Sequence, residues 1–468
     1  MRRTKIVVTL GPATDSNDTL LKLIDAGMDV ARLNFSHGDE PGHRKRFLAV
    51  REASRQTGKA VAVIADLGGP KIRLGLLPEH MILKTGKKIT LVHAEKTDST
   101  EVLPHSYRHL AEEVKPGQKI LLDDGRIGLL VNKVSEEKVL CTVLNGGPLS
   151  SHKGINLPGC NLSAPALTDK DKKDLEFAKA LGVDFFALSF VRTAQEVRET
   201  KSLAGDIPVI AKIEKPEAID DLDEILDIAD GVMVARGDLG VEVGHEKVPL
   251  LQKRIIRMAN KLAKPVITAT QMLESMIHNP SPTRAEVSDV ANAVLDGTDA
   301  LMLSGETAIG DYPVASVKTM AKIALEVESS DYYESHMKEP GIRISSFSNA
   351  IADGAAEIAR TLNLAAIAVY TESGMSAALV SAHRPRAQVI ALSRHEKVIR
   401  RMCLYWGVHS YFGDWAIDVK ELQQKAESKL IERGVVKPGD EIAMTFGFTN
   451  LDSPIQTTTL KLWRIEGE

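Results

Sequence analysis

Cysteine, aromatic residues and long apolar runs are all scarce in this sequence of 468 residues. The three cysteines, Cys141, Cys160 and Cys403, lie far apart and form no metal or redox motif, a usage typical of a reducing compartment. Aromatics make up 4% of the chain and the net charge is −4, which argues against a nucleic-acid binder. No stretch approaches the roughly 20 apolar residues of a membrane span, and the short apolar run after the N-terminus predicts a strand rather than a signal peptide. We therefore expect a cytoplasmic protein with no membrane or nucleic-acid partner.

What the sequence does contain is a series of short apolar runs separated by helix-compatible segments. The length exceeds that of a single hydrophobic core, so two to four domains are expected. The helical segments start at capping residues, such as Asp18 and Thr168, and stop at glycine. Eight apolar runs occupy residues 5–11, 30–36, 61–68, 185–191, 208–214, 231–239, 265–272 and 300–307. Strands that alternate with helices predict a parallel sheet, and eight such units predict a closed (β/α)8 TIM barrel in an α/β protein.

Two regions depart from this pattern. Residues 71–163 carry short alternating strands and an Asp-Gly hairpin turn at Asp124–Gly125, which predict a small all-β domain inserted in a barrel loop. After about residue 340 an open-sheet α/β pattern begins, with helices expected at 348–363, 396–407 and 419–434 and strands at 366–371, 387–393 and 441–447. The predicted domains are a barrel of residues 1–70 and 164–340, a β-barrel lid of 71–163 and an α/β domain of 341–468.

Polar residues gather at the ends of the predicted barrel strands, where the chemistry of such barrels lies. A single polar residue there is more often satisfied by its neighbours than functional. The same pattern on six strands predicts a functional site instead. The residues are Arg32, Asn34, Ser36, Asp66, Lys212, Glu214, Asp238, Thr270, Ser304 and Glu306.

The types of these residues predict a reaction class. Lys212 and Glu214 lie two residues apart, so both point to one face of their strand, where charges need a partner or a metal. Glu214 and Asp238, on adjacent strands, form a hard oxygen site suited to Mg²⁺ or Mn²⁺. Arg32, Lys212 and Arg73 add three cations. Such a pocket suits a phosphorylated, carboxylated small molecule, and phosphoryl transfer is the reaction that we expect.

Several longer motifs closely resemble the pyruvate kinase family. They include "KIVVTLGPAT", "ARLNFSHG", "KGINLPG", "AKIE", "VMVARGDLGVE", "TATQMLESM" and "TESGMSA", and the resemblance runs in collinear order from the N-terminus to beyond residue 400. The most specific is the run "PTRAEVSDVANAVLDGTDALMLSGETAIGDYP" from Pro282 to Pro313. The resemblance implies a catalytic barrel, a lid, a C-terminal regulatory domain and a cytoplasmic homotetramer. It also implies transfer of a phosphoryl group from phosphoenolpyruvate to ADP, giving pyruvate and ATP in the last step of glycolysis.

The resemblance also implies roles for the charged residues. Lys212 matches the lysine that neutralises the phosphoryl group in flight, and Arg32 matches the arginine that contacts the phosphate. Glu214 and Asp238 match the carboxylates that hold Mg²⁺ or Mn²⁺.

Further positions match the family's contacts with its two substrates. Thr270 and the backbone of Gly237 and Asp238 match the grip on the substrate carboxylate. Thr270 and Ser304 lie near the route that protonates the enolate, and the resemblance leaves the donor open. The residues that match positions around the nucleotide phosphates are Asn34, His37, Arg73 and Lys153.

One loop departs from the family pattern. Residues 66–73 read "DLGGPKIR" where many members read D-T-K-G-P-E-I-R. The side chains that match the K⁺ pocket of those members are Asn34, Ser36 and Asp66, with a further ligand at Leu67. Lys71 replaces the nearby glutamate, and one unit charge pair at ~4 Å and an effective dielectric of about 20 is worth roughly 4 kcal/mol. Our hypothesis is that the Lys71 ammonium replaces K⁺, so that K⁺ is not required; the alternative is a lysine turned into solvent with K⁺ still bound.

Lys215 stands where many relatives carry asparagine, and we attach no functional change to it.

The C-terminal domain contains a candidate effector site. The stretch "TESGMSA" follows a predicted strand and opens a helix, so Thr371, Ser373, Gly374 and Ser376 could bind a phosphate; the alternative is an ordinary capped turn. The stretch "FGFTNLDSPIQTTTLKLW" lacks the Gly-Thr-Asn ending of members activated by fructose 1,6-bisphosphate. A sugar phosphate or a nucleotide therefore remains possible as the effector.

Two other functions remain open. A Mg²⁺-dependent barrel lyase or aldolase acting on pyruvate would use the same Glu214 and Asp238, but it would have no use for Lys153, His37 or the lid. A metabolite-binding protein without activity would be expected to lack Lys212 or one of the carboxylates, and all three are present.

Overall fold

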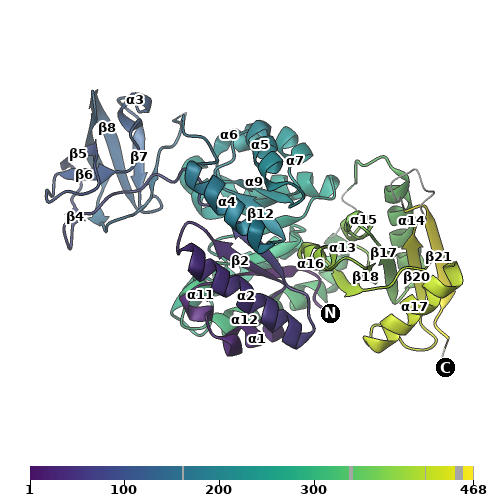
Figure 1. The fold of residues 1–468 in the computed structure, drawn as a ribbon. Coiled ribbons are helices and arrows are strands. Elements are labelled where there is room, and N and C mark those ends of the chain that lie inside the picture. The colour runs from purple at the N-terminus through teal and green to yellow at the C-terminus, as the bar shows by residue number, and fades with distance from the viewer. Residues whose placement is uncertain (161–162, 337–340, 417, 448–456, 467–468) are drawn as a thin grey trace.

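The computed structural model describes residues 1–468 except 161–162, 337–340, 417, 448–456 and 467–468. Figure 1 shows three bodies in a row, with a helix-covered barrel between a β-rich unit and a layered α/β unit that contains the C-terminus. In the described part of the chain, no helix combines the length and the apolar character needed to cross a membrane.

The eight predicted runs form a closed barrel of parallel strands, as the sequence indicates. The order around the barrel is β1-β16-β15-β14-β13-β12-β3-β2. Nearly every strand residue is buried, which explains the continuous apolar runs. Each strand is shorter than its run. The strands are β1 (Lys5–Thr9), β2 (Val30–Asn34), β3 (Ala62–Asp66), β12 (Phe185–Leu188), β13 (Val209–Ile213), β14 (Gly231–Ala235), β15 (Val266–Ala269) and β16 (Ala300–Leu303).

Helices surround this barrel and pack their apolar sides on the strands (Figure 1). Thr168 caps α4 with a reciprocal capping box, as predicted, and Gly182 ends that helix with a left-handed φ of 85°. The predicted cap of α1 at Asp18 is wrong by two residues, because the Ser16 hydroxyl accepts the Thr19 N–H and the helix begins at Asn17. The helices are α1 (Asn17–Ala26), α2 (Glu40–Thr57), α4 (Asp169–Leu181), α5 (Ala194–Ala204), α6 (Pro216–Asp220), α7 (Leu222–Ile228), α8 (Arg236–Val243), α9 (Val248–Lys261), α10 (Arg284–Leu295), α11 (Gly305–Ala308), α12 (Pro313–Glu328) and α13 (Asp331–His336).

The inserted β-rich unit lies between β3 and β12 and has its own apolar core. It contains a six-stranded sheet in the order β11-β7-β8-β9-β5-β6, a two-stranded sheet of β10 and β4, and the short helix α3, so it is mostly rather than wholly β. The predicted hairpin turn is confirmed: β7 and β8 pair from Leu122 to Ile127, and Asp124 and Gly125 lie between them with positive φ. The elements are β4 (Ile82–Leu83), β5 (Lys88–His93), β6 (Val102–His105), α3 (Leu110–Glu113), β7 (Lys119–Leu122), β8 (Ile127–Ser135), β9 (Lys138–Asn145), β10 (Gly147–Pro148) and β11 (Ile155–Asn156).

The C-terminal unit is an open sheet in the order β19-β18-β17-β20-β21, in which β21 is antiparallel to β20. The expected helix over 396–407 is partly wrong. It ends at Arg401, because Cys403 and Leu404 leave the helix to pack against the interior residues of the barrel, and β19 follows. The elements are α14 (Phe347–Leu362), β17 (Ala366–Tyr370), α15 (Met375–Ala382), β18 (Gln388–Ser393), α16 (Glu396–Arg401), β19 (Val408–Phe412), α17 (Val419–Glu432), β20 (Glu441–Phe446) and β21 (Thr459–Arg464).

Candidate active site

The carboxyl ends of the barrel strands bring most of the predicted polar residues to one rim. Arg32 lies in β2, Asp66 ends β3 and Lys212 lies in β13, which is separated from β3 by β12, so nearby strands present them to the same end of the barrel. The run 231–239 is only partly a strand. Its polar end folds as α8, so Gly237 and Asp238 lie in the first turn of a helix rather than on a strand.

Asp66 and Lys212 form the centre of a buried charge cluster. The Asp66 carboxylate accepts the Arg32 Nε–H at 2.6 Å and lies 3.2 Å from Lys212 Nζ. Lys212 Nζ also lies 2.9 Å from Glu214 Oε1 and donates to Ser189 Oγ at 2.7 Å. Asp66 and Glu214 are each 1% exposed. Ser189 was missed by the sequence analysis, although a hydroxyl directly after the four apolar residues of β12 was a signal for it.

The charges of this cluster set one another's protonation. Burial by itself would lower the pKa of Lys212, but Asp66 and Glu214 outweigh it and hold that pKa above its ordinary value. Burial would raise the pKa of Asp66, but Arg32 and Lys212 outweigh it and hold that pKa low. Burial raises the pKa of Glu214, and the nearby Asp238 carboxylate adds to this against the effect of Lys212. A further cation would therefore stabilise ionised Glu214.

The two predicted metal carboxylates lie close enough to affect each other's charge. Glu214 Oε2 accepts the backbone N–H of Phe190 at 2.8 Å, and Phe190 takes a left-handed φ of 56° to make this bond. Among the described residues, no group of three or more His, Cys, Asp or Glu is placed to hold a metal. A pair of carboxylates is nevertheless a donor set that fits Mg²⁺ or Mn²⁺, because these ions take their other ligands from water and phosphate.

Lys71 lies on the metal side of this rim rather than in the predicted K⁺ pocket. Its Nζ donates to Asp238 Oδ1 at 3.0 Å, and the described residues give it no ion pair with Asp66. The physical reason is that Asp66 is already paired with Arg32 and Lys212, which repel a third cation. In the pocket itself, Asn34 Oδ1 accepts the Ser36 N–H at 3.2 Å and the Leu67 carbonyl accepts the Ser189 hydroxyl at 2.6 Å.

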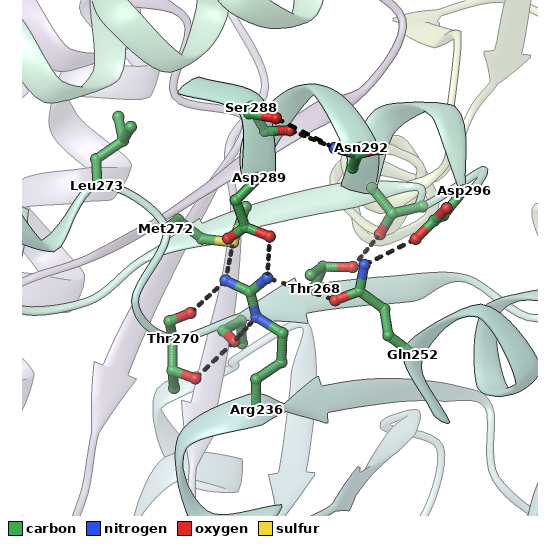
Figure 2. Close-up of polar contacts among 12 residues, drawn as sticks. Arg236, Gln252, Thr268, Thr270, Met272, Leu273, Ser288, Asp289, Asn292 and Asp296 are labelled. Atoms are coloured by element: carbon green, nitrogen blue, oxygen red, sulfur yellow. Dashed lines mark hydrogen bonds and ion pairs between the residues drawn. The ribbon is translucent and has the colours of Figure 1, made fainter. Parts of the chain in front are cut away.

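A second polar network positions Thr270 against the start of α8. The Gly237 N–H donates to Thr270 Oγ1 at 2.8 Å. Figure 2 shows the Arg236 guanidinium fixed between α8 and the loop after β15, where it donates to the Thr270 carbonyl at 2.7 Å and pairs with Asp289 at 2.7 Å. Thr270 and Gln271 take left-handed φ values of 68° and 53°. Arg236 and Asp289 were not predicted, although an arginine directly after a buried strand was a signal for such a network.

Ser304 lies at the end of β16, but the described contacts do not bring its hydroxyl to the charge cluster. Its backbone N–H donates to Glu306 Oε2 at 2.7 Å, while Glu306 Oε1 accepts the Leu273 N–H at 3.1 Å. Glu306 is 2% exposed and therefore ties two rim loops together inside the protein.

The residues expected around the nucleotide are divided between the barrel and the inserted unit. Burial lowers the pKa of His37, and Arg73, Arg32 and Lys71 lower it further, so these three cations lie near its ring. Arg73 Nη1 donates to the His152 carbonyl at 3.2 Å. Lys153 Nζ instead pairs with Asp123 at 2.7 Å, within the inserted unit. The structure thus places His37, Arg32 and Arg73 near one another. The backbone of Lys153 also lies beside Arg73, because its carbonyl accepts the Leu74 N–H at 2.9 Å, but its ammonium group is directed to Asp123.

Comparison with known proteins identifies the family. A model described as the pyruvate kinase barrel domain matches residues 1–317, and one described as the pyruvate kinase alpha/beta domain matches residues 349–462. The chain belongs to the pyruvate kinase family. It is therefore a phosphotransferase, and the resemblance stated from its motifs is confirmed.

Several pyruvate kinases are similar to this chain over almost its whole length. The pyruvate kinase of Geobacillus stearothermophilus is 47% identical over 458 residues, covering 95% of this chain and 78% of the relative. Pyruvate kinase 2 of a Synechocystis strain is 48% identical over 456 residues, covering 95% and 76%. The pyruvate kinase of Clostridium acetobutylicum is 42% identical over 476 residues, covering both chains fully.

In this pyruvate kinase family member, the predicted effector loop joins β17 to α15. The Thr371 hydroxyl accepts the Gly374 N–H at 2.9 Å and Ser373 Oγ accepts the Met375 N–H at 3.3 Å, so both act as turn caps. Ser376 Oγ bonds to Thr457 Oγ1. Much of the stretch over 446–463 that lacks the Gly-Thr-Asn ending lies outside the described residues.

Proposed function

We propose that this chain transfers the phosphoryl group of phosphoenolpyruvate to ADP, giving pyruvate and ATP in the last step of glycolysis. The observation that carries the proposal is the Lys212 ammonium between Asp66 and Glu214 at the rim of the barrel, 3.2 Å and 2.9 Å from their oxygens. Phosphoryl transfer needs positioned cations more than covalent chemistry, and this rim provides such cations. The relatives named pyruvate kinase support the same reaction.

Arg32 and Lys212 are the cations that would meet the transferring phosphoryl group. Asp66 holds both of them, and the Thr9 hydroxyl also accepts from Arg32 Nη1 at 3.0 Å, so neither side chain must reorganise during the reaction. Cations fixed in advance in a site shielded from water stabilise a developing charge more strongly than mobile ones.

The substrate carboxylate would bind to Thr270 and to the backbone of Gly237 and Asp238. The first turn of α8 presents N–H groups at the positive end of the helix, which favours an anion. The bond between the Gly237 N–H and the Thr270 hydroxyl supports this role, because it shows that the two groups lie side by side. We also assign Thr270 and Ser304 to the route by which the enolate takes up its proton.

Glu214 and Asp238 would hold Mg²⁺ or Mn²⁺. When bound, the ion supplies positive charge to the phosphate oxygens. Each carboxylate contacts a lysine in the structure, Glu214 through Lys212 and Asp238 through Lys71, which indicates that both face a region where cations are stable.

The nucleotide phosphates would lie between the barrel and the inserted unit, which then acts as a lid. Its cations would be Arg73 and Lys153, and Asn34 and His37 would line the barrel side. The proximity of His37 to Arg73 supports this placement. We propose domain boundaries near residues 70, 163 and 340, a cytoplasmic location and a homotetramer, as the family resemblance implies.

K⁺ independence remains our proposal for this member. The rim network contains three cations and three carboxylates, so its formal charge is balanced before any monovalent ion binds. The pairs that show this are Arg32–Asp66, Lys212–Glu214 and Lys71–Asp238. Lys71 would then supply its charge from beside Asp238 rather than from among Asn34, Ser36, Asp66 and Leu67.

A phosphate-bearing effector, either a sugar phosphate or a nucleotide, would bind at the loop of Thr371, Ser373, Gly374 and Ser376. Two hydrogen-bonding side chains support the proposal, because Arg394 and His395 both contact Glu372 of this loop, at 3.1 Å and 2.7 Å. A phosphate would compete with Glu372 for them.

The test is a titration of the purified chain with phosphoenolpyruvate, ADP and Mg²⁺, with pyruvate detected by lactate dehydrogenase. Pyruvate formation that requires both ADP and the divalent ion supports the proposal. Turnover of pyruvate without ADP would show a lyase or aldolase instead, and binding without turnover would show a protein without activity.

A further inference from the structure

A buried ion pair lies immediately beside the two proposed metal carboxylates. Lys215 Nζ donates to Glu242 Oε1 at 2.7 Å. Asn156 of the lid donates its side-chain Nδ2–H to the same Glu242 oxygen at 3.1 Å. The three residues are 8%, 9% and 5% exposed, so a charged group of the barrel and an amide of the lid meet away from solvent.

The position of this pair in the sequence connects it with both carboxylates. Lys215 directly follows Glu214, and Glu242 lies one helical turn after Asp238 on α8. A bond between Lys215 and Glu242 therefore joins the two elements that carry the metal carboxylates and limits the distance between them.

Asn156 connects the same pair with the lid. It lies in β11, which pairs with β7, and β7 leads into the hairpin turn that contains Gly125. A Cβ at Gly125 would lie 3.8 Å from Val241, the neighbour of Glu242 on α8. The lid therefore touches α8 at two points, through an amide and through its hairpin turn.

The remainder of this junction is not completely filled. A cavity of about 30 Å³, room for about one water molecule, lies there and is lined by Ile72, Ile155, Leu157, Phe190, Lys215 and Glu217 among others. Asn156 Oδ1 is buried with no hydrogen-bond partner among the described residues. Because an incompletely filled junction fixes an orientation weakly, the polar contacts to Glu242 carry much of the connection.

We propose that Lys215 is a positioning residue that holds Glu214 and Asp238 at the spacing a divalent cation needs, and that Glu242 and Asn156 couple the position of the lid to that metal site. The inference rests on the proposed function in one respect, the assignment of Glu214 and Asp238 as metal ligands. A single buried carboxylate thus receives one contact from the metal side and one from the lid.

The test uses the full-length protein and measures Mn²⁺ binding without substrates, from the EPR signal of free Mn²⁺. Removing Lys215 alone leaves Glu242 as an unpaired buried charge, so the double variant Lys215→Met with Glu242→Met is the main variant, and Lys215→Arg is the conservative one. We expect the Mn²⁺ Kd to rise about tenfold in the double variant, in line with the loss of an outer-shell partner, and to return close to the original value in Lys215→Arg.

The lid is followed by hydrogen exchange of residues 121–128 and 155–157 in the same samples. Asn156→Leu should speed this exchange and raise the KM for ADP while leaving the Mn²⁺ Kd unchanged, because it cuts only the contact with the lid. The control is Lys201→Met, which breaks a lysine–aspartate pair of 2.7 Å with Asp230, before β14 and therefore at the opposite end of the barrel. It should change neither measurement.

Two results separate the possible failures. A folded double variant with unchanged Mn²⁺ Kd and unchanged lid exchange overturns the positioning role. If Glu214→Gln and Asp238→Asn also bind Mn²⁺ normally, the metal site itself, and with it the proposed function, is wrong. If Glu214→Gln and Asp238→Asn no longer bind Mn²⁺ but the double variant binds it with an unchanged Kd, the metal site is correct and only the inference about Lys215 fails.

Discussion

The substitution Lys212→Met keeps an unbranched side chain of similar length and removes only the ammonium group from the centre of the rim cluster. That group lies 3.2 Å from Asp66 and 2.9 Å from Glu214. At an effective dielectric of about 20, one unit charge pair at about 3 Å is worth about 5 kcal/mol, which sets an upper limit for each lost contact. Removal of one preorganised electrostatic contact from an active site typically costs about 2.7–4 kcal/mol, or about 10²–10³ in kcat. We expect a loss of kcat in that range.

The assay couples pyruvate formation to lactate dehydrogenase and separates kcat from the KM for phosphoenolpyruvate, while the thermal midpoint shows whether the variant is folded. Lys5→Met is a matched control. Lys5 is 3% exposed and bonds to the Val408 carbonyl at 2.6 Å, but it starts β1 at the opposite end of the barrel. It should lower stability and leave kcat almost unchanged. A folded Lys212→Met variant with kcat within about tenfold of the original protein would refute the reasoning, because a cation acting on the transition state cannot be lost at so small a cost.

Three further predictions follow from other parts of the molecule. In a tetramethylammonium salt, the original protein should be fully active. The variant Lys71→Glu should be inactive in that salt and active when K⁺ is added, because the substitution makes the charge beside Asp238 more negative by two units. An original protein that needs K⁺ for activity contradicts the proposal. Burial lowers the pKa of His105 in the lid to about 4, so below about pH 6.5 the unfolded lid takes up a proton that the folded lid does not. Between pH 7.5 and pH 5 the free energy of unfolding of the lid, measured by hydrogen exchange, should therefore fall by about 2 kcal/mol. In His105→Phe this free energy should fall by less over the same pH range. A sugar phosphate or nucleotide that binds the loop at Ser376 should raise the thermal midpoint, and Ser376→Ala should reduce the shift; if none of these compounds shifts the midpoint, the enzyme is not regulated by them.

Most of the architecture could be predicted from local patterns in the sequence. The barrel strands are buried on both faces, so their apolar runs are continuous and could be counted, and the turn at Asp124–Gly125 marked its hairpin. The strand β19 was not predicted. Cys403 and Leu404, which precede it in the sequence, fit a helical pattern, but they pack on the barrel and the helix ends before them. That packing partner is distant in the sequence, and no local pattern contains it.

The candidate site shows the same division. An apolar run ending in Lys212 and Glu214 predicted a charged rim, because charged residues are stable on a buried strand only when they are paired, hydrogen-bonded or bound to a metal. The residues that contact these charges could not be predicted from the sequence. Ser189 contacts Lys212 because the strands close into a barrel, and Lys71 contacts Asp238 because the start of the inserted unit lies against the barrel.

The sequence by itself determined the number and kind of the elements and the ionisable groups at the strand ends, because periodicity and burial act over a few residues. Only the tertiary structure decided which charge meets which. It placed Lys71 on Asp238 rather than in the K⁺ pocket, and it joined Lys215 to Glu242 and the lid. The physical reason is that an ion pair depends on the distance between two side-chain tips, and that distance is set by the packing of whole domains.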